Sequence, residues 1–62
     1  MQFHIENMTC GGCVRGVTRA IRSVDPAADV RADPVTHKVD VVTTAERTKL
    51  EAALADAGFA PL

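Results

Sequence analysis

The spacing of the apolar residues changes from the period of a strand to that of a helix close to the N-terminus, and this change restricts the fold more than any other feature. Residues 2 to 7 alternate, with Phe3 and Ile5 on one face and polar residues on the other, as in a half-buried strand. From Cys13 onward the period is helical. The apolar positions of that segment are Val14, Val17, Ile21 and Val24. The sequence therefore predicts a strand, a short loop and an amphipathic helix in direct succession.

Two further strands follow the helix at short intervals. Asp25 and Pro26 end the helix, because the residue before a proline is disfavoured in helical conformation. Alternating runs that begin at Val30 and Val39 predict two strands. Residues 33–38 between them have the composition of a hairpin turn. The two strands are therefore expected to pair antiparallel.

A second helix and a short C-terminal segment complete the chain. Residues 43–46, Thr-Thr-Ala-Glu, have the form of a capping box, and Gly58 is a typical helix end. The apolar stripe between them consists of Leu50, Ala53, Leu54 and Ala57. Pro61 requires a fourth strand over residues 59–62 to be short or to lie at an edge. The order βαββαβ predicts an α+β fold, a ferredoxin-like sandwich with a four-stranded antiparallel sheet and two helices on one face.

Size and charge limit what such a chain can do. Its 62 residues allow one small domain, 1–62, and leave no room for a second catalytic lobe. The net charge of −1 gives no indication of a nucleic-acid partner. No basic region followed by an apolar stretch begins the chain, and no segment has membrane-spanning length. We therefore expect a cytoplasmic protein that does not insert into membranes.

Two thiols lie three positions apart in the run Met-Thr-Cys-Gly-Gly-Cys, residues 8–13. Two cysteines are too few for a disulfide framework, so free thiols in a reducing compartment are expected. Cu(I) prefers thiolate sulfur and accepts low coordination numbers, whereas zinc sites need three or four protein ligands. A thiolate at the start of a helix is stabilised by the positive end of the dipole. The predicted metal ligands are Cys10 and Cys13. Gly11 and Gly12 remove side-chain bulk and admit unusual backbone angles, which would let the loop open so that a partner's sulfur could reach the metal.

The sequence resembles the heavy-metal-associated domain family, which includes small bacterial copper chaperones and the metal-binding domains of copper-transporting P-type ATPases. The resemblance rests on M-T-C-G-G-C at residues 8–13, a match to the family's M-x-C-x-x-C, and covers essentially the whole chain. The hairpin from Val30 to Val41 and the segment 57–59 support it. It implies that Cys10 and Cys13 bind one Cu(I) per monomer in near-linear geometry. It also implies transfer to a partner domain with its own cysteine pair through shared three-sulfur intermediates; the expected partner is the metal-binding domain of a copper-transporting P-type ATPase.

Other candidate residues receive structural roles. Met8 is expected to pack in the core beneath the loop and not to ligate metal. His4 points away from the apolar face, and His37 is placed in a hairpin expected to be remote from the metal, so neither should reach it. His37 is expected in a left-handed turn conformation. The resemblance implies that Phe59 shields the metal site. The alternative is a core aromatic, and both roles are compatible.

A basic stripe follows one face of the first helix, formed by Arg15, Arg19 and Arg22. Residues 1–24 carry these three arginines against one acidic residue, whereas residues 25–62 carry four basic and seven acidic residues. The stripe is either a solvated helix face or a docking surface for an acidic face of an ATPase domain.

The sequence favours a binding protein, without catalytic residues, over an enzyme. The leading interpretation is a cytosolic Cu(I) chaperone that delivers copper to a transporting P-type ATPase. The alternatives are the same domain excised from an ATPase or a mercuric-ion-handling protein, and a small dithiol oxidoreductase. Hg(II) and Ag(I) accept the same two sulfurs, and open coordination positions on the metal would also allow a copper-bridged homodimer.

Overall fold

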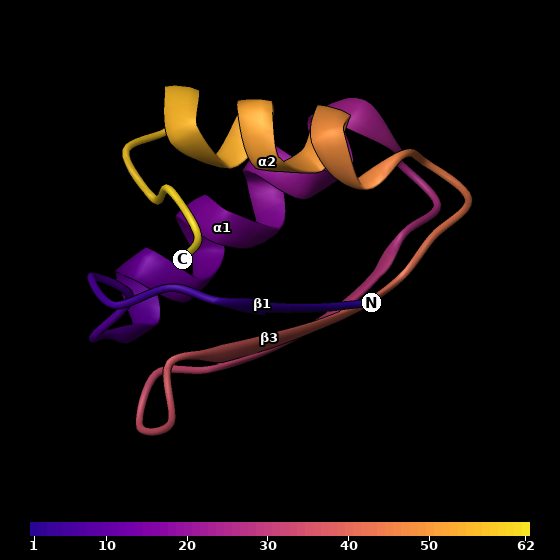
Figure 1. The fold of residues 1–62 in the computed structure, drawn as a ribbon. Coiled ribbons are helices and arrows are strands. Elements are labelled where there is room, and N and C mark those ends of the chain that lie inside the picture. Colours follow the sequence, from indigo (N-terminus) through magenta and orange to yellow (C-terminus); the bar gives the residue numbers. More distant parts are fainter.

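The sheet and both helices follow the predicted order. The computed structural model describes residues 1–62 and contains β1 (Gln2–His4), α1 (Gly11–Val24), β2 (Asp29–Asp33), β3 (Lys38–Val42) and α2 (Arg47–Asp56). The strands form an antiparallel sheet in the order β1-β3-β2. Both helices cover the same face of this sheet (Figure 1). The α+β, ferredoxin-like prediction is confirmed. Neither helix combines the length and the apolar character that a membrane span requires.

The C-terminal segment lies along β1 without forming a regular strand. The Leu62 amide donates a hydrogen bond of 2.8 Å to the His4 carbonyl, at the edge of β1 that β3 leaves free. Pro61 has no amide hydrogen to add to such a ladder. The described sheet therefore has three strands, and the segment occupies the place predicted for the fourth.

The core lies between the sheet and the two helices and contains no buried polar side chain. Its eleven residues are Phe3, Ile5, Met8, Val17, Ala20, Ile21, Ala28, Val39, Val41, Leu50 and Leu54. The alternating strand residues and the inner helix faces supply it, as their periodicity predicts. Ala57 is the exception, because it is exposed beyond the last turn of α2.

Both helices begin at positions that differ from the prediction. The first begins at Gly11 with Cys10 as its N-cap residue, two residues before the predicted start at Cys13. The predicted capping box of α2 is wrong, because the N-cap residue is Glu46 and no side chain caps the helix. The Thr43 hydroxyl instead accepts a hydrogen bond from the Ala45 amide. It also donates one to Asp25.

The C-terminal end of α2 agrees with the prediction. Gly58 has a φ of 88°, the left-handed conformation that glycine adopts without steric cost. Its amide donates to the Ala55 carbonyl at 3.0 Å, and the Phe59 amide donates to the Leu54 carbonyl at 2.8 Å. These two bonds form a Schellman motif. The motif turns the chain so that Phe59 packs back toward the core.

Asp25 connects the end of α1 to the segment that leads into α2. Its carboxylate accepts hydrogen bonds from the Thr43 hydroxyl and the Ala27 amide. These bonds lower the pKa of Asp25 below its ordinary value of 3.8, and the bond from Thr43 has the largest effect. A carboxyl with a lower pKa in the folded state stabilises the fold above its unfolded pKa. That contribution is lost as the pH falls through the folded pKa.

We expect Asp25→Asn to lower the midpoint of thermal unfolding at pH 7. The deficit relative to the unmodified protein should shrink as the pH falls through the folded pKa of Asp25, because protonation then removes the same contribution from both. Asp40→Asn is the matched control, since Asp40 is exposed on β3. Circular dichroism melts at several pH values measure both variants. A deficit that stays constant down to the lowest pH would contradict this account.

Candidate metal centre

Three loops converge at one end of the molecule (Figure 1). The loop between β1 and α1 carries the cysteines. The β2–β3 turn lies beside it, because His4 at the end of β1 pairs with Lys38 at the start of β3. The third segment follows α2, and its Gly58 carbonyl accepts a hydrogen bond of 2.6 Å from the Asn7 side chain. The cysteine loop is thus held between two neighbours that are distant in sequence.

The two thiols predicted to bind metal lie side by side. The Sγ atoms of Cys10 and Cys13 are 3.2 Å apart, within hydrogen-bonding distance of each other. Cys10 is exposed and Cys13 is half-buried, and both are free thiols. No group of three or more His, Cys, Asp or Glu side chains is arranged to hold a metal ion. The arrangement therefore offers two sulfur donors that solvent and an incoming partner can reach.

The position of Cys13 favours its thiolate. It is the third residue of α1, and the Val14 amide makes the first helical hydrogen bond, to the Cys10 carbonyl. The amides of the first turn therefore have no helical acceptor. The pKa of Cys13 lies below its ordinary value, chiefly because the Thr9 backbone and then the Cys10 side chain hydrogen-bond to it. A lowered thiol pKa reduces the competition between protons and a metal ion near neutral pH.

The two glycines between the cysteines place no side chain beside the thiols. Two collinear metal–sulfur bonds, taken at the zinc–sulfur length of about 2.3 Å, would place the sulfurs about 4.6 Å apart. A Cβ atom at Gly11 would meet nothing within 4 Å, and one at Gly12 would meet Cys10 Sγ at 3.8 Å and Arg15 at 3.9 Å. Neither glycine has a positive φ, so neither uses the unusual backbone angles that glycine admits. Both lie in the regular first turn of α1 and contribute by lacking side chains.

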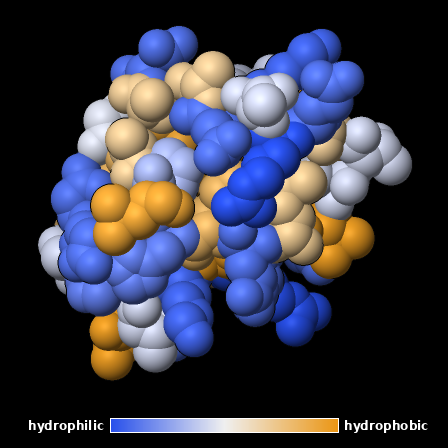
Figure 2. All heavy atoms as spheres, in the orientation of Figure 1, coloured by the Kyte–Doolittle hydropathy of each residue, from blue (hydrophilic) through white to orange (hydrophobic).

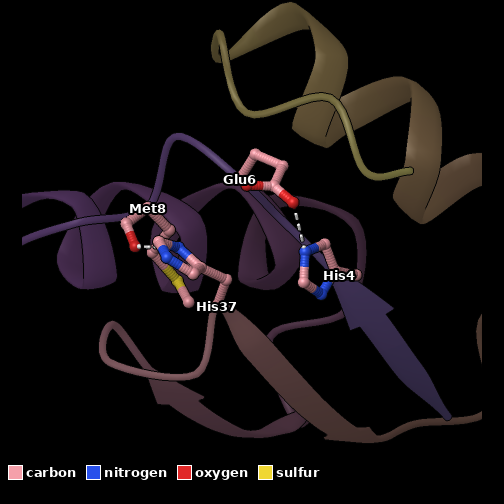
Figure 3. A network of polar contacts seen from close by, with 4 residues as sticks. All are labelled: His4, Glu6, Met8 and His37. Carbon is pink, nitrogen blue, oxygen red and sulfur yellow. Dashed lines mark hydrogen bonds and ion pairs between the residues drawn. The ribbon is translucent and has the colours of Figure 1, made fainter.

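The prediction that the hairpin of His37 is remote from the cysteine loop is wrong. The His37 ring Nδ1 lies 3.2 Å from the Met8 carbonyl oxygen, as Figure 3 shows. The predicted left-handed conformation is confirmed by its φ of 61°. His4 Nε2 lies 2.7 Å from the Glu6 carboxylate, and this contact lowers the pKa of Glu6. The His4 and His37 ring centroids are 6.1 Å apart.

Met8 and Phe59 both support the loop from the core side. The Met8 side chain is fully buried, as predicted. The Phe59 ring packs on α1 at Gly16, where an added Cβ atom would lie 3.0 Å from the ring edge. The core-aromatic role of Phe59 is thus confirmed. Its shielding of the metal site stays a prediction.

The arginine stripe is exposed and free of ion pairs. Arg15, Arg19 and Arg22 line a shallow groove along α1 together with Val14, Thr18 and Ser23. The ion pairs of the protein are elsewhere, between His4 and Glu6, Arg31 and Asp29, and Arg47 and Glu51. On the face seen in Figure 2, hydrophobic residues form separate patches between hydrophilic ones. The positive charge beside Cys13 is therefore available to a partner.

Comparisons with known proteins agree with this geometry. The chain is 40% identical over 60 residues to copper-transporting ATPase 1 of Rhizobium meliloti (strain 1021), covering 94% of this chain and 7% of the ATPase. A structure of a gold binding protein is 51% identical, with a TM-score of 0.94 and coverage of 98% of this chain and 94% of that one. The copper chaperone Atx1 from Synechocystis PCC6803 is 27% identical, with a TM-score of 0.96 and coverage of 100% and 98%. The profile of the heavy-metal-associated domain matches residues 2–60. The chain belongs to the heavy-metal-associated domain family.

Proposed function

We propose that the protein binds one Cu(I) ion between Cys10 and Cys13 and passes it to the metal-binding domain of a copper-transporting P-type ATPase. The observation that carries the proposal is the pair of accessible free thiols, 3.2 Å apart, at the start of α1. Soft thiolate donors select Cu(I). The likeness to a copper chaperone and to copper-transporting ATPases supports the choice of metal and partner.

Transfer follows from the small number of ligands. A metal held by two sulfurs has open positions, so a thiolate of a partner can bind before either original bond breaks. Cys10 is exposed and is the sulfur that a partner meets with less obstruction. Cys13, half-buried and with a lowered pKa, is suited to hold the metal until the second exchange. The same open positions would allow copper to bridge two copies, which sedimentation with and without Cu(I) would detect.

Binding and transfer are tested separately. Anaerobic titration against a competing Cu(I) chelator should give one tightly bound Cu(I) per chain. The loaded protein should then deliver copper to an isolated ATPase domain that carries its own cysteine pair, without a pool of free ion. Tight binding without delivery would favour a storage role or a domain excised from a larger protein. Failure to bind Cu(I) at all would overturn the proposal.

The arginine stripe is proposed to steer the partner domain. Reversing Arg15 and Arg19 to Glu should slow copper transfer about tenfold at low salt, because exposed charges at an interface act mainly on the association rate. Cu(I) affinity should not change. Reversal of Arg31 and Lys49 to Glu makes the same change in net charge outside the stripe and is the control. Stopped-flow transfer rates that are equal for both double variants would remove the docking role.

Gold is a second candidate cargo, favoured by the 51% identity to the gold binding protein. Au(I), Ag(I) and Hg(II) are soft ions that two thiolates also accept. Competition between Cu(I) and Au(I) for one equivalent of protein separates the two candidates.

A dithiol oxidoreductase, the enzyme alternative, would instead show insulin reduction and a reduction potential suited to thiol–disulfide exchange.

A further inference from the structure

His37 contacts the cysteine loop at two points, although it lies 27 positions after Cys10 in the sequence. Its backbone carbonyl accepts a hydrogen bond of 2.8 Å from the Ile5 amide. Its ring Nδ1 lies 3.2 Å from the Met8 carbonyl, and because a carbonyl can only accept, Nδ1 must carry the proton and donate. One residue of the hairpin thus binds both ends of the turn from Ile5 to Met8. Within this turn, the Met8 amide donates a hydrogen bond of 3.3 Å to the Ile5 carbonyl.

The backbone of His37 adopts a disfavoured conformation at this position. Its φ of 61° is the only positive φ outside glycine, in a region where a residue with a side chain is disfavoured. A glycine would adopt that conformation without steric cost. A glycine, however, would have no ring to reach Met8. The turn conformation alone would be served better by glycine. The histidine ring therefore has a separate role, which is its contact with the Met8 carbonyl.

The Met8 carbonyl and the Thr9 amide belong to one peptide unit. The chain contains no cis peptide bond, so this unit is planar and trans, with its C=O and N–H on opposite sides. His37 binds the oxygen side of the plane. Thr9, whose amide lies on the other side of this plane, directly precedes Cys10 in the loop. The orientation of this one plane therefore connects the hairpin to the cysteine pair.

We propose that His37 is a positioning residue for metal retention: by fixing the Met8–Thr9 peptide plane through its ring, it holds the loop in the conformation that supports the Cys10–Cys13 pair. Figure 3 shows the ring directed at the Met8 carbonyl from the hairpin side. The effect on metal retention rests on the proposed function. The effect on the peptide plane does not, and the two can be measured separately.

The test variant is His37→Gly, with His4→Ala as the matched control. The glycine keeps the backbone able to adopt the left-handed conformation and removes only the ring. His4 is an imidazole in the same cluster, but its ring bonds the exposed Glu6 side chain and no backbone atom of the loop. The rate of Cu(I) release to a chromophoric chelator is measured at fixed pH, together with the amide ¹⁵N shift of Thr9 in the metal-free protein.

His37→Gly should release Cu(I) about two- to tenfold faster than the unmodified protein, the factor expected for one net hydrogen bond. The Thr9 shift should change, because its peptide loses the bond to the carbonyl, while the unfolding midpoint changes little. His4→Ala should match the unmodified protein in both measurements. If His37→Gly does not fold, His37→Asn replaces it, since asparagine tolerates the left-handed conformation and its side chain is shorter than imidazole.

Three results would overturn the inference: an unchanged release rate, an unchanged Thr9 shift, or equal acceleration by His4→Ala. Failure of the unmodified protein to bind Cu(I) would count against the proposed function alone. The Thr9 shift of the metal-free variants would still decide whether His37 orients the peptide plane.

Discussion

Replacing either Cys10 or Cys13 with serine is expected to abolish tight Cu(I) binding. Each variant leaves one thiolate, and no third His, Cys, Asp or Glu side chain is grouped with the pair to replace the lost donor. The serine hydroxyl is a hard, weak donor for a soft ion. We expect the affinity to fall by several orders of magnitude for both variants. Anaerobic competition with a Cu(I) chelator, followed by metal analysis of the desalted protein, measures the loss.

The fold should survive both substitutions, which makes the loss interpretable. Cys10 is exposed and Cys13 half-buried, so neither fills the centre of the core. His4→Ala serves as the control for an alternative nitrogen ligand and should bind Cu(I) as the unmodified protein does. Retention of tight binding by either serine variant would falsify the assignment of a two-sulfur site.

Met8 is expected to act through the core and not through the metal. Its side chain is fully buried, so Met8→Ala should destabilise the protein by about 2–5 kcal/mol. Met8→Leu nearly conserves the volume and should cost less than about 1.5 kcal/mol. Urea unfolding monitored by circular dichroism measures both changes.

The leucine variant decides whether the thioether also binds metal. It removes the sulfur and keeps an apolar side chain beneath the loop. Its Cu(I) affinity should equal that of the unmodified protein, whereas a thioether ligand would make it weaker. A clear loss of affinity in Met8→Leu at normal stability would show that the site has a third donor.

The repeating features of the sequence predict the elements and most of the core. Burial can be inferred from the spacing of apolar residues alone. The alternation at Phe3 and Ile5 and the helical spacing of Val17 and Ile21 are examples. Helix starts are less well determined, because they depend on single hydrogen bonds. The hydroxyl of Thr43 has two competing uses, and in the folded protein it bonds Asp25 in preference to capping α2.

The position of His37 beside the cysteine loop follows from the sheet topology and not from the local sequence pattern. In an antiparallel sheet, the turn before β3 lies at the end of the sheet where its neighbour β1 finishes. Counting strand directions would have placed the hairpin beside the cysteine loop. The ring contact to Met8 carries no periodic signal, since it joins two irregular segments. The clustering of the two thiols, in contrast, follows from the chain itself, because residues three apart at a helix start lie close together.

X-ray absorption at the copper edge counts the atoms bound to the metal and identifies them by element. The protein is loaded anaerobically with less than one equivalent of Cu(I), at a dilution where it sediments as a monomer. We expect two sulfur neighbours, supplied by Cys10 and Cys13, and no nitrogen or oxygen neighbour. A nitrogen or oxygen atom in the first coordination shell of monomeric protein, or a spectrum unchanged in the Cys10→Ser variant, would contradict this expectation.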